Sequence, residues 1–197
     1  MITTIILAAG EARRMGQPKQ LMQIQDQSLV ERAVRTAQSV SEWVVVVTGA
    51  YQEQVRKEVA PLGVITVHNS QWASGMGSSI STGIQKAMSF SSVPGAVIIM
   101  LCDQPLVDEE LLKQLIKVHK DTRKPLVASA YRDVLGVPAV FAEPLFRELL
   151  KLQGKIGAQK VIARYASEAA SVDFPQGSDD VDTPEDYARV QKLLSQN

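Results

Sequence analysis

The residues of this sequence that are best suited to chemistry are charged side chains that follow runs of apolar residues. One apolar run is followed by Arg14 and Lys19, and another by Asp103. Cations at such places neutralise charge on the oxygens of a phosphate group as it is transferred, and a carboxylate can hold the Mg²⁺ that accompanies the phosphates. The pattern therefore predicts phosphoryl-type transfer, which depends on positioning and charge neutralisation and needs no covalent nucleophile.

The segment after the first apolar run is built from small residues. Ala8, Ala9 and Gly10 leave backbone amides that can bond a base or a ribose, and Gly16 permits backbone angles that are closed to other residues. The segment has neither the Gly-Lys-Ser/Thr of a P-loop nor the Gly-x-Gly-x-x-Gly of dinucleotide folds. A solvated basic loop would explain its charges equally well, but its place directly after a buried strand favours a nucleotide site.

A second cluster of glycines and hydroxyls follows the third apolar run. Exposed amides and hydroxyls there suit recognition of a base edge or a ribose. Helix capping by Ser78 or Ser79, with Gly75 and Gly77 forming the turn, explains the same residues without a ligand. Trp72 precedes the cluster and is expected to be partly buried by packing, with no catalytic role.

Carboxylates are expected at the same edge of the sheet. Asp103 ends a buried strand where Mg²⁺ could take one or two carboxylates and complete its octahedron with phosphates and water, although a turn before Pro105 also explains it. The aspartates between positions 179 and 186 are harder to assign. They belong to a helix-start signal in which Thr183 caps the helix and Pro184 occupies its first position.

The elements that must position these residues alternate between short β-branched runs and amphipathic stretches. Strands are expected at 3–7, 44–47, 64–67, 97–101, 126–129 and 139–141, with an extended stretch at 170–174. Helices are expected at 29–38, 52–59, 79–88, 109–119, 143–151 and 157–165, and from Thr183-Pro184 onward. This order predicts a Rossmann-like, three-layer α/β/α fold with a mostly parallel sheet that becomes mixed after a turn at Gly136-Val137-Pro138. Ligands should bind outside the carboxyl ends of the parallel strands.

Composition limits the classes of function. With 197 residues, 45% of them hydrophobic, the chain can bury one core, and residues 1–197 are expected to form a single domain. Its 21 basic residues cancel 21 acidic ones, so no overall positive field would hold nucleic acid or an anionic membrane surface. Cys102 is the one cysteine, which excludes an intramolecular disulfide and a cysteine-rich zinc site. No apolar run is long enough to span a membrane, so the protein is expected in the cytoplasm.

These segments together resemble one enzyme family. Residues 7–21 resemble the signature L-A-A-G-x-x-x-R-M-G-x-P-K of the NTP-transferase family, and within it the molybdenum cofactor cytidylyltransferases. The second cluster is similar to the family pattern W-x-x-G-M-G-S-S-I-x-x-G, and the segment before the last helix is similar to D-x-D-T-P-E-D. The resemblance extends from Leu7 to Tyr187.

The resemblance implies roles for particular residues. It implies that Arg14 contacts the triphosphate, that Lys19 contacts the α-phosphate in the transition state, and that Asp182 joins Asp103 on the metal. Contacts to the nucleotide are implied for Ala8, Ala9, Gly10, Gly75, Gly77, Ser78, Ser79 and Gly83. Ala-Ala-Gly looks like the cytidylyl branch, whereas the guanylyl branch usually has Ala-Gly-Gly, so CTP is the expected nucleotide.

The implied reaction is transfer of CMP from CTP to the molybdopterin form of molybdenum cofactor, with Mg²⁺ as cofactor and release of pyrophosphate. A molybdoenzyme would receive the product. Two departures from the family pattern affect the acceptor side: Val137 replaces histidine and Lys155 replaces aspartate. The alternatives are a guanylyltransferase, a sugar-phosphate or alcohol-phosphate nucleotidyltransferase, or a non-catalytic carrier of the cofactor, although a carrier would not need Lys19 and the two aspartates.

Overall fold

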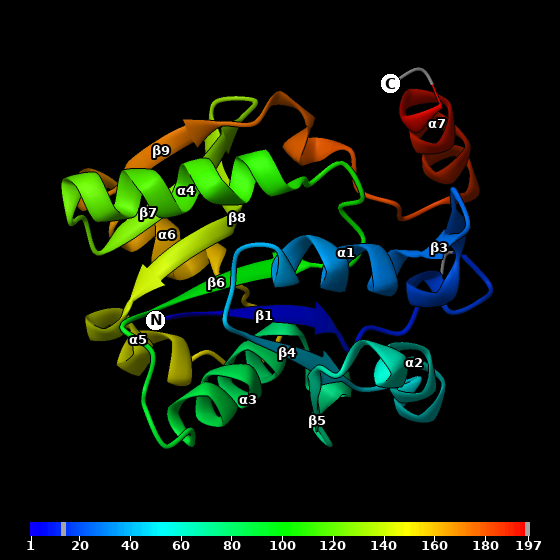
Figure 1. The fold of residues 1–197 in the computed structure, drawn as a ribbon, viewed down its shortest axis with the longest axis horizontal. Coiled ribbons are helices and arrows are strands. Elements are labelled where there is room, and N and C mark those ends of the chain that lie inside the picture. Colours follow the sequence, from blue (N-terminus) through cyan, green and yellow to red (C-terminus); the bar gives the residue numbers. More distant parts are fainter. Residues whose placement is uncertain (13–14, 196–197) are drawn as a thin grey trace.

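The structure, a computed structural model, describes residues 1–12 and 15–195. A seven-stranded sheet lies at its centre, with helices on both faces (Figure 1). The strands of the sheet are β1 (Ile2–Ala8), β4 (Trp43–Thr48), β5 (Ile65–His68), β6 (Ala96–Leu101), β7 (Leu126–Tyr131), β8 (Val134–Ala142) and β9 (Ala170–Asp173). The helices are α1 (Leu29–Gln38), α2 (Gln52–Val59), α3 (Met76–Met88), α4 (Glu109–Thr122), α5 (Phe146–Leu150), α6 (Gln159–Arg164) and α7 (Pro184–Leu194).

The strand order is β5-β4-β1-β6-β8-β7-β9, and the first four of these strands are parallel. β8 runs antiparallel to β6 and β7, while β9 is parallel to β7. The predicted Rossmann-like, mostly parallel sheet with a mixed second half is therefore confirmed. In the register of the sheet, Leu7 pairs with both Val47 and Leu101, so β1, β4 and β6 end together at the edge where a ligand is expected.

Each face of the sheet buries its own hydrophobic core. Alternate residues of a strand point to opposite faces, so Ile6 and Met100 pack with α1, α2 and α4, whereas Ile5 and Ile99 pack with α3, α5 and α6. All four side chains are almost completely buried. This explains why the central strands read as continuous apolar runs rather than as alternating ones.

A third, smaller core holds the C-terminal helix. α7 packs with the short hairpin formed by β2 (Gln23–Ile24) and β3 (Gln27–Ser28), at one end of the molecule (Figure 1). Thr183 caps α7: its hydroxyl accepts a hydrogen bond from the N–H of Asp186, whose side chain accepts one from the N–H of Thr183. The expected helix start is confirmed, and it fixes the segment that carries Asp182.

Two local expectations were wrong. The turn expected at Gly136-Val137-Pro138 lies instead at Arg132 and Asp133, which have φ values of 47° and 61°, and residues 136–138 belong to β8 at a shift of register. The glycine and proline mark a bulge in the strand. α3 begins at Met76 rather than at Ser79, so the second glycine cluster partly lies inside the helix. Within the described ranges, no helix is long and apolar enough to cross a bilayer.

Candidate nucleotide-binding site

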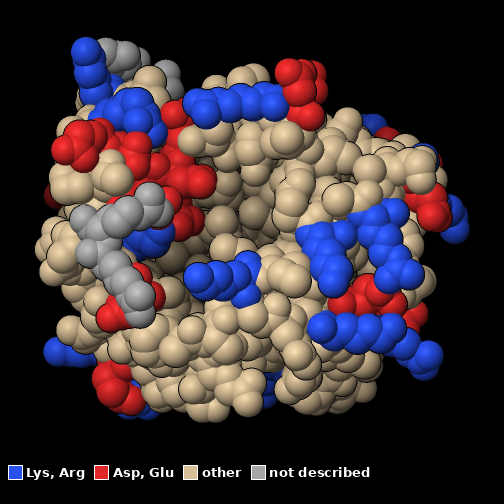
Figure 2. Space-filling model, turned by 180° about the vertical axis from the view of Figure 1, so that it is seen from behind, with Lys and Arg blue, Asp and Glu red and all other residues tan. Residues whose placement is uncertain are grey.

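A cavity of about 350 Å³ lies at the carboxyl ends of β1 and β6. Seen from behind, the molecule is hollowed near its centre, and acidic side chains gather along one rim of the hollow (Figure 2). The cavity is lined by Leu7, Ala8, Ala9, Gly10, Glu11, Lys19, Gln20, Trp72, Ala73, Gly75, Met76, Ser79, Leu101, Cys102, Asp103 and Lys155. Five of the predicted nucleotide contacts, together with Lys19 and Asp103, therefore surround one space.

Lys19 places its ammonium group between two carboxylates. It begins a 3₁₀ turn (Lys19–Leu21), and its Nζ lies 2.5 Å from Asp103 Oδ2 and 2.8 Å from Asp182 Oδ1. Burial by itself lowers the pKa of the ammonium, but the Asp103 carboxylate and the hydrogen bonds to both aspartates outweigh burial and hold the pKa above its ordinary value. Lys19 is therefore a permanent cation at neutral pH.

The two aspartates fit a divalent cation that is bound together with a nucleotide. Asp103 Oδ1 is buried and has no hydrogen-bond partner among the described residues, so this oxygen is available to coordinate a cation. Within residues 1–12 and 15–195, no group of three or more acidic, histidine or cysteine side chains could hold a metal without help. Mg²⁺ commonly takes only one or two carboxylates and completes its coordination with phosphates and water. Asp103 and Asp182 suit that kind of site.

A third carboxylate, Asp180, lies beside this pair and was not selected from the sequence. Burial, followed by the nearby Asp103 carboxylate, raises its pKa from 3.8 to about 6. The N–H of Val181 donates to the backbone carbonyl of Asp103 at 2.9 Å, which ties the segment of Asp180 to the end of β6. The helix-start signal does not mark the proximity of Asp180 to the end of β6, because that proximity depends on this tertiary contact.

The raised pKa of Asp180 predicts a pH-dependent effect of Asp180→Asn. Below pH 3.8 the carboxyl is protonated in folded and unfolded chains alike; between pH 3.8 and 6 the unfolded chain loses its proton first, so the wild type loses stability as the pH rises. In metal-free buffer, the variant should melt at a higher temperature than the wild type at pH 8 and at the same temperature near pH 4. Thermal unfolding at several pH values tests this, and a pH-independent difference would contradict it.

The turn that leaves β1 is held by the buried amide of Gln20. Its Nε2 donates to the carbonyls of Ala8 at 3.1 Å and of Gly10 at 2.7 Å, and only 1% of Gln20 is exposed. The C=O and N–H of a trans peptide point in opposite directions, so fixing the Ala8 carbonyl also fixes the following N–H. Apart from Gly10 and its two chain neighbours, no described residue has an atom within 4 Å of the position that a side chain of Gly10 would take. Gln20 was missed from sequence because its partners are backbone atoms.

Gln20→Met should raise the KM for the nucleotide by about 10-fold, because two side-chain hydrogen bonds worth roughly 1 kcal/mol each would no longer orient the turn. The melting temperature should also fall. Gln38→Met is the matched control, since Gln38 Nε2 donates to one backbone carbonyl, that of Leu62, at an exposed position. Steady-state kinetics test the prediction, and equal KM values for the two variants would contradict it.

The second glycine cluster contributes Gly75 and Ser79 to the cavity. Gly75 has φ +127°, and a side chain there would lie 2.3 Å from the carbonyl oxygen of Gly154, so glycine permits both the backbone angle and the contact. Ser79 Oγ accepts a hydrogen bond from Asn69 Nδ2 at 3.0 Å. The buried Asn69, which is 3% exposed, therefore holds the Ser79 side chain in place in the lining of the cavity.

Three of the other predicted residues lie outside the lining of this cavity. Gly77 contacts the 153–156 segment, since a side chain there would lie 2.6 Å from the Ile156 oxygen, and Gly83 lets α3 approach β1, with Ile5 Cγ2 at 2.5 Å from the equivalent position. The hydroxyl of Ser78 donates to the carbonyls of Gly75 and of Gln71, and it faces a neighbouring cavity. Arg14 lies outside the described residues.

Nucleotidyl transfer is the chemistry that suits this arrangement, because small residues leave backbone groups accessible beside a fixed cation and a pair of carboxylates. The fold and the site thus define a nucleotidyltransferase. The chain belongs to the MobA-like NTP transferase family, whose domain matches residues 4–170.

Similar proteins cover most of the chain. Purine catabolism protein PucB of Bacillus subtilis is 28% identical, with 97% of this chain and 96% of PucB aligned. Nicotine blue oxidoreductase of Paenarthrobacter nicotinovorans is 32% identical over 71% of this chain and 66% of its own length. The crystal structure of Rv0371c from Mycobacterium tuberculosis superimposes with a TM-score of 0.81 at 26% identity, covering 97% of each chain. The same protein in complex with manganese gives a TM-score of 0.79 at 25% identity, covering 97% of this chain and 98% of that one.

Proposed function

We propose that the protein transfers CMP from CTP to the terminal phosphate of the molybdopterin form of molybdenum cofactor and releases pyrophosphate. The observation that carries the proposal is the position of Lys19, held between Asp103 and Asp182 at the edge of the cavity. The geometry supports nucleotidyl transfer, and the motifs of the first turn support CTP and the pterin acceptor by resemblance.

The chain's own residues would act by orientation and by charge. The turn at Ala8–Gly10 would hold the nucleoside through backbone groups, and Lys19 would neutralise charge on the α-phosphate as the acceptor phosphate attacks in line. Asp103 and Asp182 would hold the divalent cation, which when bound polarises the phosphates and neutralises the leaving pyrophosphate. The manganese complex of Rv0371c supports a divalent cation in this family. No residue needs to form a covalent intermediate.

Cys102 is excluded as a nucleophile although it lines the cavity. Its thiol is buried, and burial, together with the Asp103 carboxylate, raises its pKa to about 12. The reactive thiolate is therefore almost absent at neutral pH. A direct attack of the acceptor phosphate on the nucleotide remains the simplest course.

Pyrophosphate release tests the proposal. Purified protein is supplied with Mg²⁺, one of CTP, GTP, ATP or UTP, and one acceptor, which is molybdenum cofactor, a sugar phosphate or an alcohol phosphate. Mn²⁺ replaces Mg²⁺ in a parallel series. Release with CTP alone would support the proposal. Release with GTP would indicate a guanylyltransferase. Release only with sugar phosphates or alcohol phosphates would show that one of these, rather than molybdenum cofactor, is the acceptor. Binding of the cofactor with no release under any condition would indicate the carrier.

A further inference from the structure

We infer that Trp72 forms the wall of the nucleoside subsite and that its indole packs against the base of the bound nucleotide. The inference rests on the proposed nucleotide transfer but not on the identity of the acceptor or of the base. It revises the expectation that Trp72 serves packing alone.

The two ends of the cavity carry different charged groups: Lys19 and Asp103 lie together at one end, whereas Lys155 lies next to Gly75, near the segment of Trp72. At the first end Lys19 would neutralise the negative charge of a triphosphate and Asp103 would hold its cation, so the triphosphate is expected there. The nucleoside then extends along the small-residue turn of β1. Trp72 and Met76 line the cavity beyond that turn, with no carboxylate among the lining residues of their segment.

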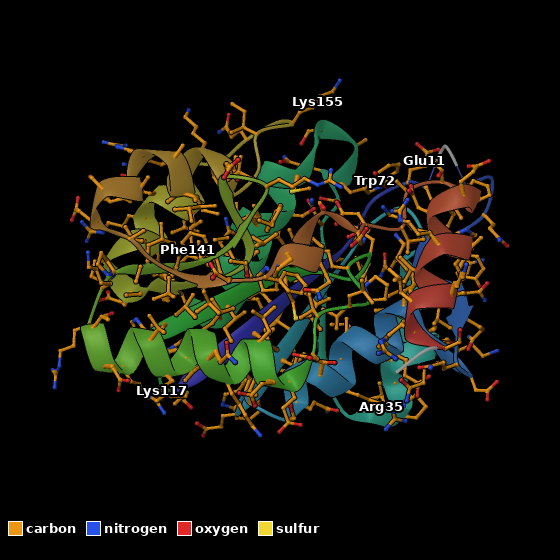
Figure 3. The ribbon with its side chains drawn as sticks, turned by 90° about the horizontal axis from the view of Figure 1, so that it is seen from above. Glu11, Arg35, Trp72, Lys117, Phe141 and Lys155 are labelled. Atoms are coloured by element: carbon orange, nitrogen blue, oxygen red, sulfur yellow. The ribbon has the colours of Figure 1, made fainter. Side chains whose placement is uncertain are left out.

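Trp72 lies directly against the turn. If Gly49 had a side chain, its first carbon would lie 2.4 Å from the Ala9 carbonyl oxygen and 2.6 Å from Trp72 Cβ. Trp72 and Ala9 can therefore approach each other only because position 49 is glycine. Glu11, Trp72 and Lys155 lie along one side of the molecule although they come from distant segments (Figure 3). Trp72 Cβ is thus placed beside the turn of β1, at a point where Trp72 also lines the cavity.

Hydrogen bonds hold the segment of Trp72 in place. The side-chain oxygen of Asn69 accepts from the N–H of Gln71 at 2.9 Å, and the Asn69 carbonyl accepts from the N–H of Trp72 at 3.2 Å. The N–H of Asn69 donates to the carbonyl of Thr48, which links the segment to β4. The backbone of Trp72 is therefore fixed and its side chain packs against the core, so a base can pack on it without a large loss of conformational freedom.

The partial burial of Trp72 fits a ligand-facing role. The side chain packs on one side against the core shared by α3, α5 and α6, yet it also lines the cavity. Stacking between a base and an aromatic side chain requires such a supported and accessible ring, and it tolerates every base because each has a π face. Trp72 therefore contributes affinity for the nucleoside, while the choice of base must come from other contacts.

The two tryptophans allow a direct test. Trp43, the other tryptophan, begins β4 at the opposite edge of the sheet, is 45% exposed and packs against Phe90. In Trp43→Phe, Trp72 is the one remaining fluorophore of its kind. Titration with CTP, GTP, ATP and UTP, each with Mg²⁺, should change its fluorescence in a saturable way for the nucleotides that bind. Calorimetry on the same protein measures binding independently.

Kinetics provide the second readout. Trp72→Ala should raise the KM for the nucleotide by about 10–100-fold, whereas Trp72→Phe should raise it by less than about 5-fold because phenylalanine retains a stacking surface. The kcat should change little in both variants, since the interaction is the same in the ground state and the transition state. Trp43→Phe should leave both parameters unchanged.

The outcomes separate this inference from the proposed function. A response to GTP in place of CTP would overturn the choice of base but support the role of Trp72. Nucleotide binding seen by calorimetry without a fluorescence change, or equal KM values for Trp72→Ala and the wild type, would overturn the inference. A response to the pterin cofactor alone would assign Trp72 to the acceptor and would also overturn it. If no nucleotide binds at all, both the inference and the proposed function fail.

Discussion

Lys19→Met is expected to lower kcat for pyrophosphate release by about 10²–10³-fold, because one preorganised cation at a developing charge contributes that much to the rate. The KM for the nucleotide should change much less, since methionine retains the length of the side chain and the turn is held by Gln20. Lys113→Met is the matched control: Lys113 forms an exposed ion pair with Glu109 on α4. Activity of Lys19→Met equal to that of the control would contradict the assignment.

The same substitution should also affect stability in a way that depends on metal. Without Lys19, the Asp103 and Asp182 side chains lose the ammonium that both contact in the metal-free protein. Leaving the partly buried Asp103 carboxylate without the ammonium costs roughly 1–3 kcal/mol, which corresponds to a melting temperature lower by about 3–8 °C in EDTA. Mg²⁺ should restore part of the loss, and calorimetry at several Mg²⁺ concentrations would measure the recovery.

Asp103→Asn should lower Mg²⁺-dependent turnover by about 10³-fold, equivalent to several kcal/mol of metal contribution to the transition state. The fold should persist, because the hydrogen bond that ties β6 to the α7 segment uses the backbone carbonyl of Asp103 rather than its side chain. Circular dichroism tests the fold, and a Mg²⁺ titration of pyrophosphate release tests the chemistry.

Asp121→Asn serves as the control for this variant. Asp121 pairs with Lys117 on an exposed face of α4, so its loss should leave turnover unchanged. Full activity in Asp103→Asn, or an equal loss in both variants, would remove Asp103 from the proposed metal site.

Much of the fold could be predicted because local and global signals agree. α1 and α2 have the predicted bounds, and α1 begins after Ser28, whose side chain accepts from the N–H of Glu31. At the hairpin of β7 and β8 the local sequence signals disagree with the structure, so the predicted turn was in the wrong place. Its turn uses Arg132 and Asp133 in left-handed conformations that sequence composition does not mark, while the glycine and proline nearby mark a bulge.

The candidate site was predictable in part. Asp103 could be selected because it follows a strand, and Lys19 because it follows the small-residue segment after another strand, whereas Asp182 was indicated by the family resemblance. The structure brings the three together across separations of 84 and 163 residues. The role of a glycine cannot be inferred from its sequence position in the same way. Gly75 lines the cavity but Gly83 only lets a helix approach a strand, and the two look alike in sequence. Gln20 was also missed, because its role depends on the direction of one buried amide.

The contact between Lys19 and Asp182 has a consequence for biosynthesis. During translation, the turn at Ala8–Gly10 and Lys19 are synthesised first, followed by the strand that precedes Asp103. Asp182 is synthesised only after all strands of the central sheet. Until Asp182 leaves the ribosome, the lysine has one of its two carboxylate partners and the proposed metal site has one ligand. If the proposed metal site is correct, a partly synthesised protein would be unable to consume nucleoside triphosphate until α7 and its leading segment have docked.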